Sequence, residues 1–376
     1  MKMAEAPAYR VPYVNFPAQF ESARTEIMAA VEGVFSRGEF VGGGGIIAAL
    51  EAKIAAFCGA AHAIALNSGT DALILAMRGL GIGAGDEVIT PPNSFVASAA
   101  AIIATGATPL FADVQDDQNI DPGAIEDAIT PRTRAIMPVH LTGRVADMDA
   151  INAIAERHGL AVVEDAAQAF GSRYRGRSAG GLGSVGCFSA HPLKNLNAAG
   201  DAGFVVTDDA EVANRIRLLR NHGLIDRNTV VEWGTVSRLD GIQAAVLLSR
   251  LERLDGVIAR RRATAEIYRN AITSNAIFMA PCRDYEFNTF HTFVIQTDNR
   301  DRLAAHLSKC GVETAIHYPI PIHLQPAAQA LGYERGRFPV TERQAERILS
   351  LPIHQDLSED DIQHVADSVN AFRFGT

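Results

Sequence analysis

Short apolar runs rich in β-branched residues alternate with helix-period stretches between about residues 61 and 210. Each run is too short for a helix and nearly all apolar, as expected for strands buried on both faces of a sheet. The predicted strands are His62–Leu66, Glu87–Thr90, Thr108–Phe111, Arg134–Pro138, Ala161–Glu164 and Gly203–Thr207. This alternation predicts an α/β fold around a mainly parallel sheet.

Helices are predicted where apolar residues recur at helical spacing, and several of these stretches stop at a glycine. They are Glu21–Phe35, Ala48–Phe57, Thr70–Gly79, Ser94–Gly106 and Met148–His158. A glycine-rich loop, Val41–Gly45, is expected between the first two.

The pattern changes near Leu239. The stretch from Gly241 to Ile272 is apolar at first and basic later, and predicts one long helix between two subdomains. The segments TFHTFVIQTD, DRLAAHLSKCG and VETAIHYPIP then predict strand, helix and strand, and SEDDIQHVADSVNAF predicts a last helix. We therefore expect an N-terminal segment and large domain over residues 1–250, and a small C-terminal α/β domain over residues 251–376.

Composition narrows the class of protein. With 48% hydrophobic and 20% charged residues among 376, wholesale disorder, collagen and a polar coiled coil are excluded. The net charge of −9 argues against a nucleic-acid partner. The 4 cysteines are far apart, so neither a metal site nor a disulfide framework is predicted. Without an apolar leader or a membrane-length apolar run, we expect a cytoplasmic protein with no membrane partner.

The motif LNSGTDAL, residues 66–73, ends a strand and opens a helix at once. Free N–H groups at a helix N-terminus favour an anion, and Gly69 lets a phosphate approach the backbone closely. An ordinary helix start explains the same residues, with Ser68 or Thr70 as the cap and Gly69 as a turn.

The motif VVEDAAQAFGS, residues 162–172, delivers Asp165 to the carboxyl end of a strand, the edge where open α/β sheets bind ligands. A carboxylate there can pair with a cationic ring nitrogen, and Gln168 follows one turn later. The alternative is that Asp165 only caps the following helix.

The segment from Gly186 to Thr207 places Lys194 in a loop of small and apolar residues between two strands. A lysine shielded from water loses proton affinity and becomes a nucleophile able to form a Schiff base. A solvated loop lysine is the alternative. In chain order, a phosphate cradle, an acid and a lysine are the three fixed points of a pyridoxal-phosphate site: phosphate, ring nitrogen and aldehyde carbon.

Eight motifs resemble, in order and spacing, the DegT/DnrJ/EryC1/StrS family of pyridoxal-phosphate-dependent sugar aminotransferases. They are LNSGTDAL, GDEVITPPNSFVAS, PVHLTGR, VVEDAAQAFGS, CFSAHPLKN, GDAGFVVT, SRLDGIQAA and HYPIPIHLQP. The resemblance implies the type I fold, as in aspartate aminotransferase, and a homodimer with active sites at the subunit interface. It also implies an amino acid donor, L-glutamate, and a nucleotide-linked keto sugar as acceptor, with pyridoxamine phosphate formed during turnover.

The resemblance also implies roles for single residues. Lys194 looks like the Schiff-base lysine and Asp165 like the partner of the ring nitrogen. The other residues that it implies contact the cofactor are Gly69, Thr70, Phe95, Gln168 and Ser189. A packed core phenylalanine is the alternative for Phe95.

Two more residues are placed by the resemblance on the sugar-nucleotide side, His317 and Tyr318. A packed strand end beside Pro319 is the alternative for both. Family members commonly carry asparagine at the position of Val236 and reach the neighbouring subunit's phosphate with it, so that contact is in doubt here. Whether a 3-keto or a 4-keto sugar is aminated stays open. GDAG and SRLD resemble family members that act on 3-keto sugars, whereas the histidine of SAHPLK is equally common in members that act on 4-keto sugars.

Parts of the sequence can be compared with three other functions. A pyridoxamine-phosphate sugar dehydratase would carry histidine in place of Lys194. A nicotinamide dehydrogenase could use Gly181–Gly186, which matches GxGxxG, with Asp201 about 20 residues on, but no strand leads into that motif and no helix leaves it. A non-catalytic regulator with this fold would not need the complete catalytic set.

Overall fold

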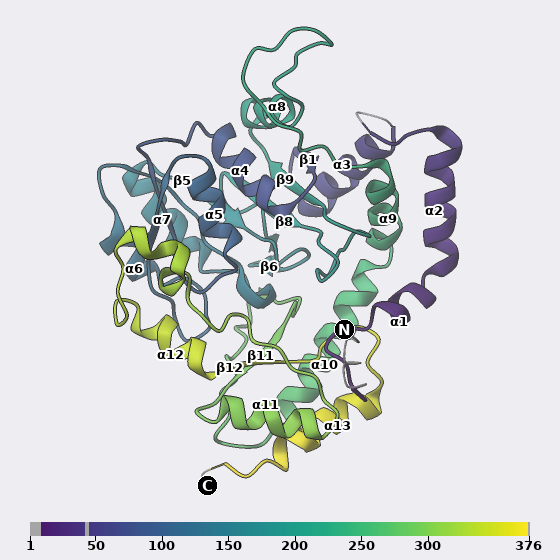
Figure 1. The fold of residues 1–376 in the computed structure, drawn as a ribbon, viewed down its shortest axis with the longest axis vertical. Coiled ribbons are helices and arrows are strands. Elements are labelled where there is room, and N and C mark those ends of the chain that lie inside the picture. The colour runs from purple at the N-terminus through teal and green to yellow at the C-terminus, as the bar shows by residue number, and fades with distance from the viewer. Residues whose placement is uncertain (1–8, 42–44, 375–376) are drawn as a thin grey trace, which may run out of the picture.

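The computed structural model describes residues 9–41 and 45–374. Its centre is a seven-stranded sheet with the order β1-β9-β8-β5-β4-β2-β3 (Figure 1). The strands are β1 (His62–Leu66), β2 (Glu87–Thr90), β3 (Thr108–Phe111), β4 (Thr133–Ile136), β5 (Ala161–Asp165), β8 (Val185–Ser189) and β9 (Gly203–Thr207). Only β9 runs antiparallel to its neighbours. The predicted mainly parallel sheet is confirmed, with β8 as a strand that was not predicted separately.

The sheet is buried on both faces because successive side chains of a strand point to opposite sides. Val163 and Val205 lie in one apolar core with residues of α4, α5 and α8. Val162 and Val206 lie in the other, with residues of α3, α6, α7 and α9. These helices are α3 (Gly45–Cys58), α4 (Gly69–Gly79), α5 (Ala97–Ala104), α6 (Pro122–Ala128), α7 (Met148–His158), α8 (Ala210–Leu219) and α9 (Gly241–Leu251).

The predicted long helix from Gly241 to Ile272 is wrong as a single element. It breaks after α9, and α10 (Leu254–Ala271) continues beyond the break. Leu247 of α9 packs in the core of the large sheet, whereas Tyr268 of α10 packs in the C-terminal core. Because the two halves bury different faces against different cores, one straight helix cannot serve both.

The C-terminal part is built from a two-stranded antiparallel sheet, β11 (Phe293–Gln296) and β12 (Ile348–Leu351), with α10, α11 (Arg300–Lys309) and α13 (Glu359–Asn370). The strand predicted in VETAIHYPIP does not form. That segment makes only single bridges, Val312 to Val11 and Ala315 to Ser350. Its prolines lack the N–H that a strand ladder needs.

Shorter elements complete the chain. They are α1 (Phe16–Glu21), α2 (Arg24–Arg37), η1 (Leu141–Gly143), β6 (Arg173–Tyr174), β7 (Arg177–Ser178), β10 (Glu286–Phe287), η2 (Ile322–Leu324), η3 (Pro326–Leu331) and α12 (Pro339–Arg347). The glycine-rich loop predicted at Val41–Gly45 lies largely outside the described residues. Within residues 9–41 and 45–374, no helix combines the length and apolarity needed to cross a bilayer.

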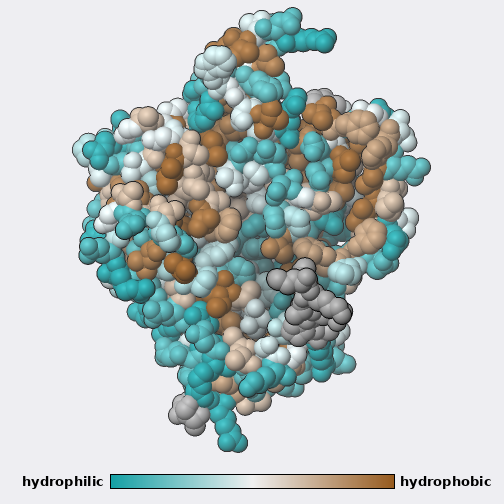
Figure 2. Space-filling model, viewed as in Figure 1, coloured by the Kyte–Doolittle hydropathy of each residue, from teal (hydrophilic) through white to brown (hydrophobic). Residues whose placement is uncertain are grey.

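The chain between α8 and α9 rises above the rest of the molecule as a loop, here called the arm, residues 221–236 (Figure 1). Figure 2 shows brown, hydrophobic residues on this arm. Trp233 is 84% exposed at its surface, with Ile225, Val230, Val231 and Val236 also exposed. The arm thus offers an apolar surface that the chain itself leaves uncovered.

Candidate active site

Three strands bring the predicted residues to one edge of the sheet. β1 and β8 both run antiparallel to β9, so they run parallel to each other, and β5 runs parallel to β8. Their carboxyl ends therefore point the same way and carry Ser68, Asp165 and Ser189. This is the edge at which open α/β sheets bind ligands.

Gly69 opens α4 directly against Ser189. A Cβ added at Gly69 would lie 2.6 Å from the Ser189 Cβ, so no larger residue fits without displacement. Ser68 caps the helix by accepting a hydrogen bond from the Asp71 N–H at 3.1 Å. Thr70 is partly buried in the first turn. The cap role and the anion-site role are compatible, because one cap leaves other N–H groups of this 11-residue helix free.

Asp165 is 4% exposed. The Ser98 hydroxyl donates to its Oδ2 at 2.7 Å, and the Ala167 N–H donates to Oδ1 at 3.2 Å. Burial raises the pKa of Asp165, while Ser98, Ala167, Lys194 and His140 act in the opposite direction. Among the described residues no basic side chain forms an ion pair with Asp165, so the carboxylate is available to a cationic ring nitrogen.

Lys194 lies in the loop between β8 and β9 and is partly buried. Burial lowers the pKa of Lys194 from 10.5 to about 8, although the charge of Asp165 raises it. A lysine with this pKa is partly neutral near physiological pH, which makes it a nucleophile.

Gln168, Tyr318 and Phe95 gather at the same site. The Gln168 Nε2 donates to the Tyr318 hydroxyl at 3.3 Å, and its Oε1 accepts from the Thr142 N–H at 2.8 Å. The Phe95 ring lies 5.6 Å from the Tyr318 ring and is 54% exposed. Phe95 is therefore not a packed core residue, and its ring is free to stack on a ligand.

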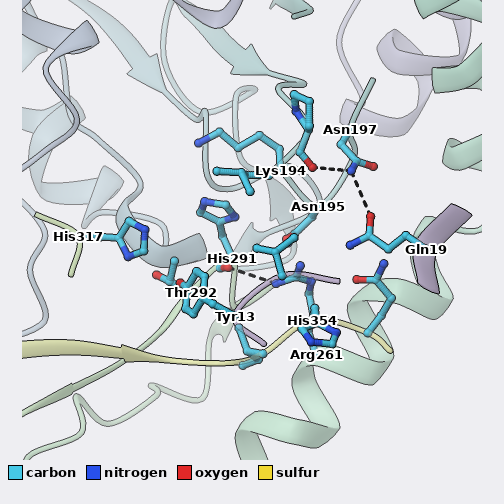
Figure 3. Close-up of a pocket in the computed structure, with 15 residues that line it drawn as sticks. Tyr13, Gln19, Lys194, Asn195, Asn197, Arg261, His291, Thr292, His317 and His354 are labelled. Atoms are coloured by element: carbon cyan, nitrogen blue, oxygen red, sulfur yellow. Dashed lines mark hydrogen bonds between the residues drawn. The ribbon is translucent and has the colours of Figure 1, made fainter. Parts of the chain in front are cut away.

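His317 approaches the site from the C-terminal part of the chain and lines a pocket together with Lys194 (Figure 3). Its Nδ1 lies 2.9 Å from the Ser350 hydroxyl, and its ring stacks on Tyr13 at 5.7 Å. Burial lowers the pKa of His317 to about 4, with a further contribution from Lys194. The imidazole is thus neutral near pH 7.

The glycine-rich segment that could have bound a dinucleotide has another role. Its backbone N–H groups at Leu182 and Gly183 donate to the buried carboxylate of Glu164 at 2.7 and 2.6 Å, and the N–H of the preceding Gly180 donates to it at 2.7 Å. The His140 Nε2 contacts the same carboxylate at 2.8 Å. The loop precedes a strand, β8, instead of a helix. Because these N–H groups already donate to Glu164, they are not free to bind a pyrophosphate. The segment therefore does not form the dinucleotide site that a dehydrogenase would need.

Sequence reasoning missed Ser98, which holds Asp165 and itself accepts from the Ser94 hydroxyl at 3.0 Å. The four-residue spacing of Ser94 and Ser98 was a usable signal, because it would place both on one face of the predicted helix Ser94–Gly106. In the structure α5 begins only at Ala97, and Ser94 reaches Ser98 from the loop before it. It also missed His291 and Arg261, which line the pocket beside Lys194. No local motif distinguishes these two residues.

The residues present fit pyridoxal phosphate. The site offers a helix start that only glycine permits beside Ser189, a buried carboxylate lacking a basic partner among the described residues, and a lysine with lowered pKa. These suit the phosphate, the ring nitrogen and the aldehyde of that cofactor.

The chain matches the DegT/DnrJ/EryC1/StrS aminotransferase family over residues 21–370. It is 45% identical over 368 residues to a Streptomyces venezuelae protein named dTDP-3-amino-3,4,6-trideoxy-alpha-D-glucose transaminase, covering 97% of this chain and 96% of the relative. The solved structure of S. venezuelae DesV in complex with a ketimine intermediate is similar with a TM-score of 0.94 and 45% identity, covering 96% and 98% of the two chains. NtdA from Bacillus subtilis, solved with bound cofactor PMP, is similar with a TM-score of 0.90 and 29% identity, covering 98% and 86%.

The chain therefore belongs to the DegT/DnrJ/EryC1/StrS aminotransferase family. The family, the α/β aminotransferase fold, the transaminase activity and the pyridoxal phosphate cofactor, all predicted from the sequence, are confirmed. The roles of single residues stay predictions that the geometry described above supports.

Proposed function

We propose that this protein moves the amino group of L-glutamate to carbon 3 of a nucleotide-linked 3-keto sugar. The observation that carries the proposal is the meeting of Lys194, with a pKa of about 8, and the buried Asp165 at one sheet edge. The relative at 45% identity, named for a dTDP-3-amino sugar, supports the choice of acceptor and of carbon.

Pyridoxal phosphate, when bound, supplies an electron sink for the charge left by a broken Cα–H bond. Asp165 would hold a proton on the ring nitrogen, because a buried carboxylate is stabilised by a cationic partner. Phe95 would orient the ring by stacking, and Gln168 would contact the ring hydroxyl. Gly69, Thr70 and Ser189 would hold the phosphate at the start of α4.

Lys194 would hold the cofactor covalently and then, once released by the donor, carry the proton from the donor carbon to the cofactor. Its lowered pKa suits both tasks, because a base works best with a pKa near the working pH. His317, which lines the same pocket as Lys194, and Tyr318 would contact the sugar. Both are held in place, His317 by Ser350 and Tyr318 by Gln168.

The working unit in this proposal is a homodimer with shared active sites. The exposed apolar arm supports it, and the base of the arm is anchored near the cofactor edge, where the Ser237 hydroxyl donates to the Asn67 Oδ1 at 3.1 Å. Val236 is 48% exposed next to this anchor and has no polar group for a phosphate of the neighbouring subunit. The cytoplasm is the proposed location.

Amino transfer from ¹⁵N-glutamate to a panel of dTDP- and UDP-linked keto sugars tests this function, with NMR locating the nitrogen in the product. We expect transfer to carbon 3, and no turnover by the Lys194→Ala variant. Lys309→Ala, on the exposed face of α11, is the matched control and should retain full activity. Failure to aminate any nucleotide-linked keto sugar, or turnover by Lys194→Ala, would contradict the proposal.

A further inference from the structure

The pocket beside Lys194 is lined by cationic and neutral groups without an acid among its described lining residues. The ionisable side chains that line it are Tyr13, Lys194, Arg261, His291, His317 and His354. Figure 3 shows Lys194 and Arg261 on either side of His291. A pocket with this lining attracts an anion, because nothing in its described wall neutralises the cations.

Arg261 of α10 is 7% exposed, which is unusual for a charged residue without a carboxylate partner. Its Nη1 donates to the main-chain oxygens of Phe290 and His291 at 3.2 and 3.1 Å. Its Nε is buried without a partner in the described part of the chain. The main chain thus holds Nη1 of the guanidinium, and the Nε donor is left unpaired among the described residues. Nε and its neighbouring terminal nitrogen form the edge with which an arginine binds a carboxylate by two hydrogen bonds.

The histidines of the pocket do not add charge near pH 7. Burial lowers the pKa of His317 and of His354 to about 4, and that of His291 well below its usual value. Arg261 itself keeps its proton, since burial lowers its pKa only to about 10. The acid that influences Arg261 is Asp356, which forms no ion pair with it. The cation is therefore fixed and has no close counterion among the described residues.

We propose that Arg261 binds a carboxylate of the amino-acid donor. This inference rests on the proposed function, because amino transfer brings an amino-acid donor, with its carboxylates, to Lys194. The donor's amino group must reach the position where Lys194 acts, so its carboxylates must lie in the adjoining space. Arg261 is the buried guanidinium that lines that space. A diphosphate of the nucleotide sugar offers the same anionic chemistry, and the experiment separates the two sources.

The test compares Arg261→Met and Arg261→Lys with the wild-type holoenzyme. Calorimetry measures the affinity for glutarate, an unreactive dicarboxylate, and the cofactor absorbance follows the half-reaction with glutamate. For Arg261→Met we expect Kd for glutarate and KM for glutamate to rise about 10- to 100-fold, as for a lost charged hydrogen bond. KM for the nucleotide sugar should change by less than about twofold, since this residue holds the other substrate. Arg261→Lys should lie between, because it keeps the charge and loses the two-pronged edge.

Arg262→Gln is the matched control, since Arg262 follows on the same helix and donates instead to the Asn288 carbonyl at 2.8 Å, away from the pocket. It should bind glutarate as the wild type does. A larger KM for the nucleotide sugar with unchanged glutamate values would assign Arg261 to a diphosphate and overturn the proposal, as would unchanged glutarate binding in both variants. If Arg261→Met does not fold, the glutarate affinity and the KM values of Arg261→Lys alone test the proposal.

The half-reaction with alanine shows which carboxylate is bound. If Arg261→Met loses half-reaction activity equally with alanine and with glutamate, Arg261 binds the α-carboxylate. If it loses activity only with glutamate, Arg261 binds the side-chain carboxylate. Both outcomes support the proposal. If the wild type transfers no amino group at all, the proposed function fails, whereas unchanged substrate constants in an active Arg261→Met variant overturn only this inference.

Discussion

Lys194 acquires its reactivity from burial at one edge of the sheet. The loop that carries it lies between β8 and β9, and removal from water lowers its pKa to about 8 in spite of Asp165. A lysine in water would be almost fully protonated at neutral pH. At the scale of the residue, chemistry is therefore decided by solvent exclusion.

The rate at which cofactor-free protein captures pyridoxal phosphate should report this shift. Only the neutral amine attacks, so the rate should rise about tenfold per pH unit below pH 8 and level off above it. Stopped-flow absorbance gives the rate, and borohydride reduction with peptide mass spectrometry identifies Lys194 as the attached residue. A rate still rising tenfold per unit between pH 9 and 10 would show an unperturbed lysine.

At the scale of elements, Glu164 joins the end of β5 to the loop that enters β8. Three main-chain N–H groups and His140 bind its fully buried carboxylate. The neighbouring Asp165 faces the cofactor side of the same strand end. The hydrogen bonds to Glu164 therefore help to hold the end of β5, the strand that presents Asp165.

Replacement of Glu164 by glutamine should destabilise the protein by about 2 kcal/mol or more. The amide NH₂ cannot accept the hydrogen bonds that one carboxylate oxygen accepts, and buried donors left unpaired are costly. Urea unfolding measures the loss. The control is Glu252→Gln, whose exposed ion pair with Lys53 should be worth less than about 1 kcal/mol. Equal stability of the two variants would contradict this role of Glu164.

At the scale of the whole molecule, the arm between α8 and α9 is the feature that a single chain leaves unexplained. It projects apolar side chains into solvent (Figures 1 and 2), and the Trp233 side chain is 84% exposed. Apolar surface of this kind in a folded protein marks an interaction site. A second copy of the chain is the partner in the proposed function.

Trp233→Ser should weaken the homodimer, because large aromatic residues carry much of the binding energy of an interface. Sedimentation velocity over a range of concentrations should show a dissociation constant at least about tenfold higher than that of the wild type. Trp233→Phe keeps a large apolar ring and should remain dimeric. A wild-type chain that sediments as a monomer would contradict the dimer, and an unaffected Trp233→Ser dimer would place its interface elsewhere.

The local sequence by itself determined several strands of the sheet and the positions of the main site residues. The strands at residues 62–66, 87–90, 108–111 and 203–207 were predicted with correct bounds, because burial on both faces leaves a short apolar run that is readable by itself. The motifs around Gly69, Asp165 and Lys194 were readable for the same reason, since each follows directly on such a run.

Only the tertiary structure decided the features that depend on residues far apart in the sequence. The break between α9 and α10 follows from two cores that bury different helix faces, and β12 forms because β11 lies beside it. Arg261 is 67 residues from Lys194 in sequence yet lines the same pocket. Its guanidinium is held by main-chain carbonyl groups of another segment, those of Phe290 and His291. Local spacing records what one element buries, but it does not record which elements meet, because that choice is made by the packing of the whole chain.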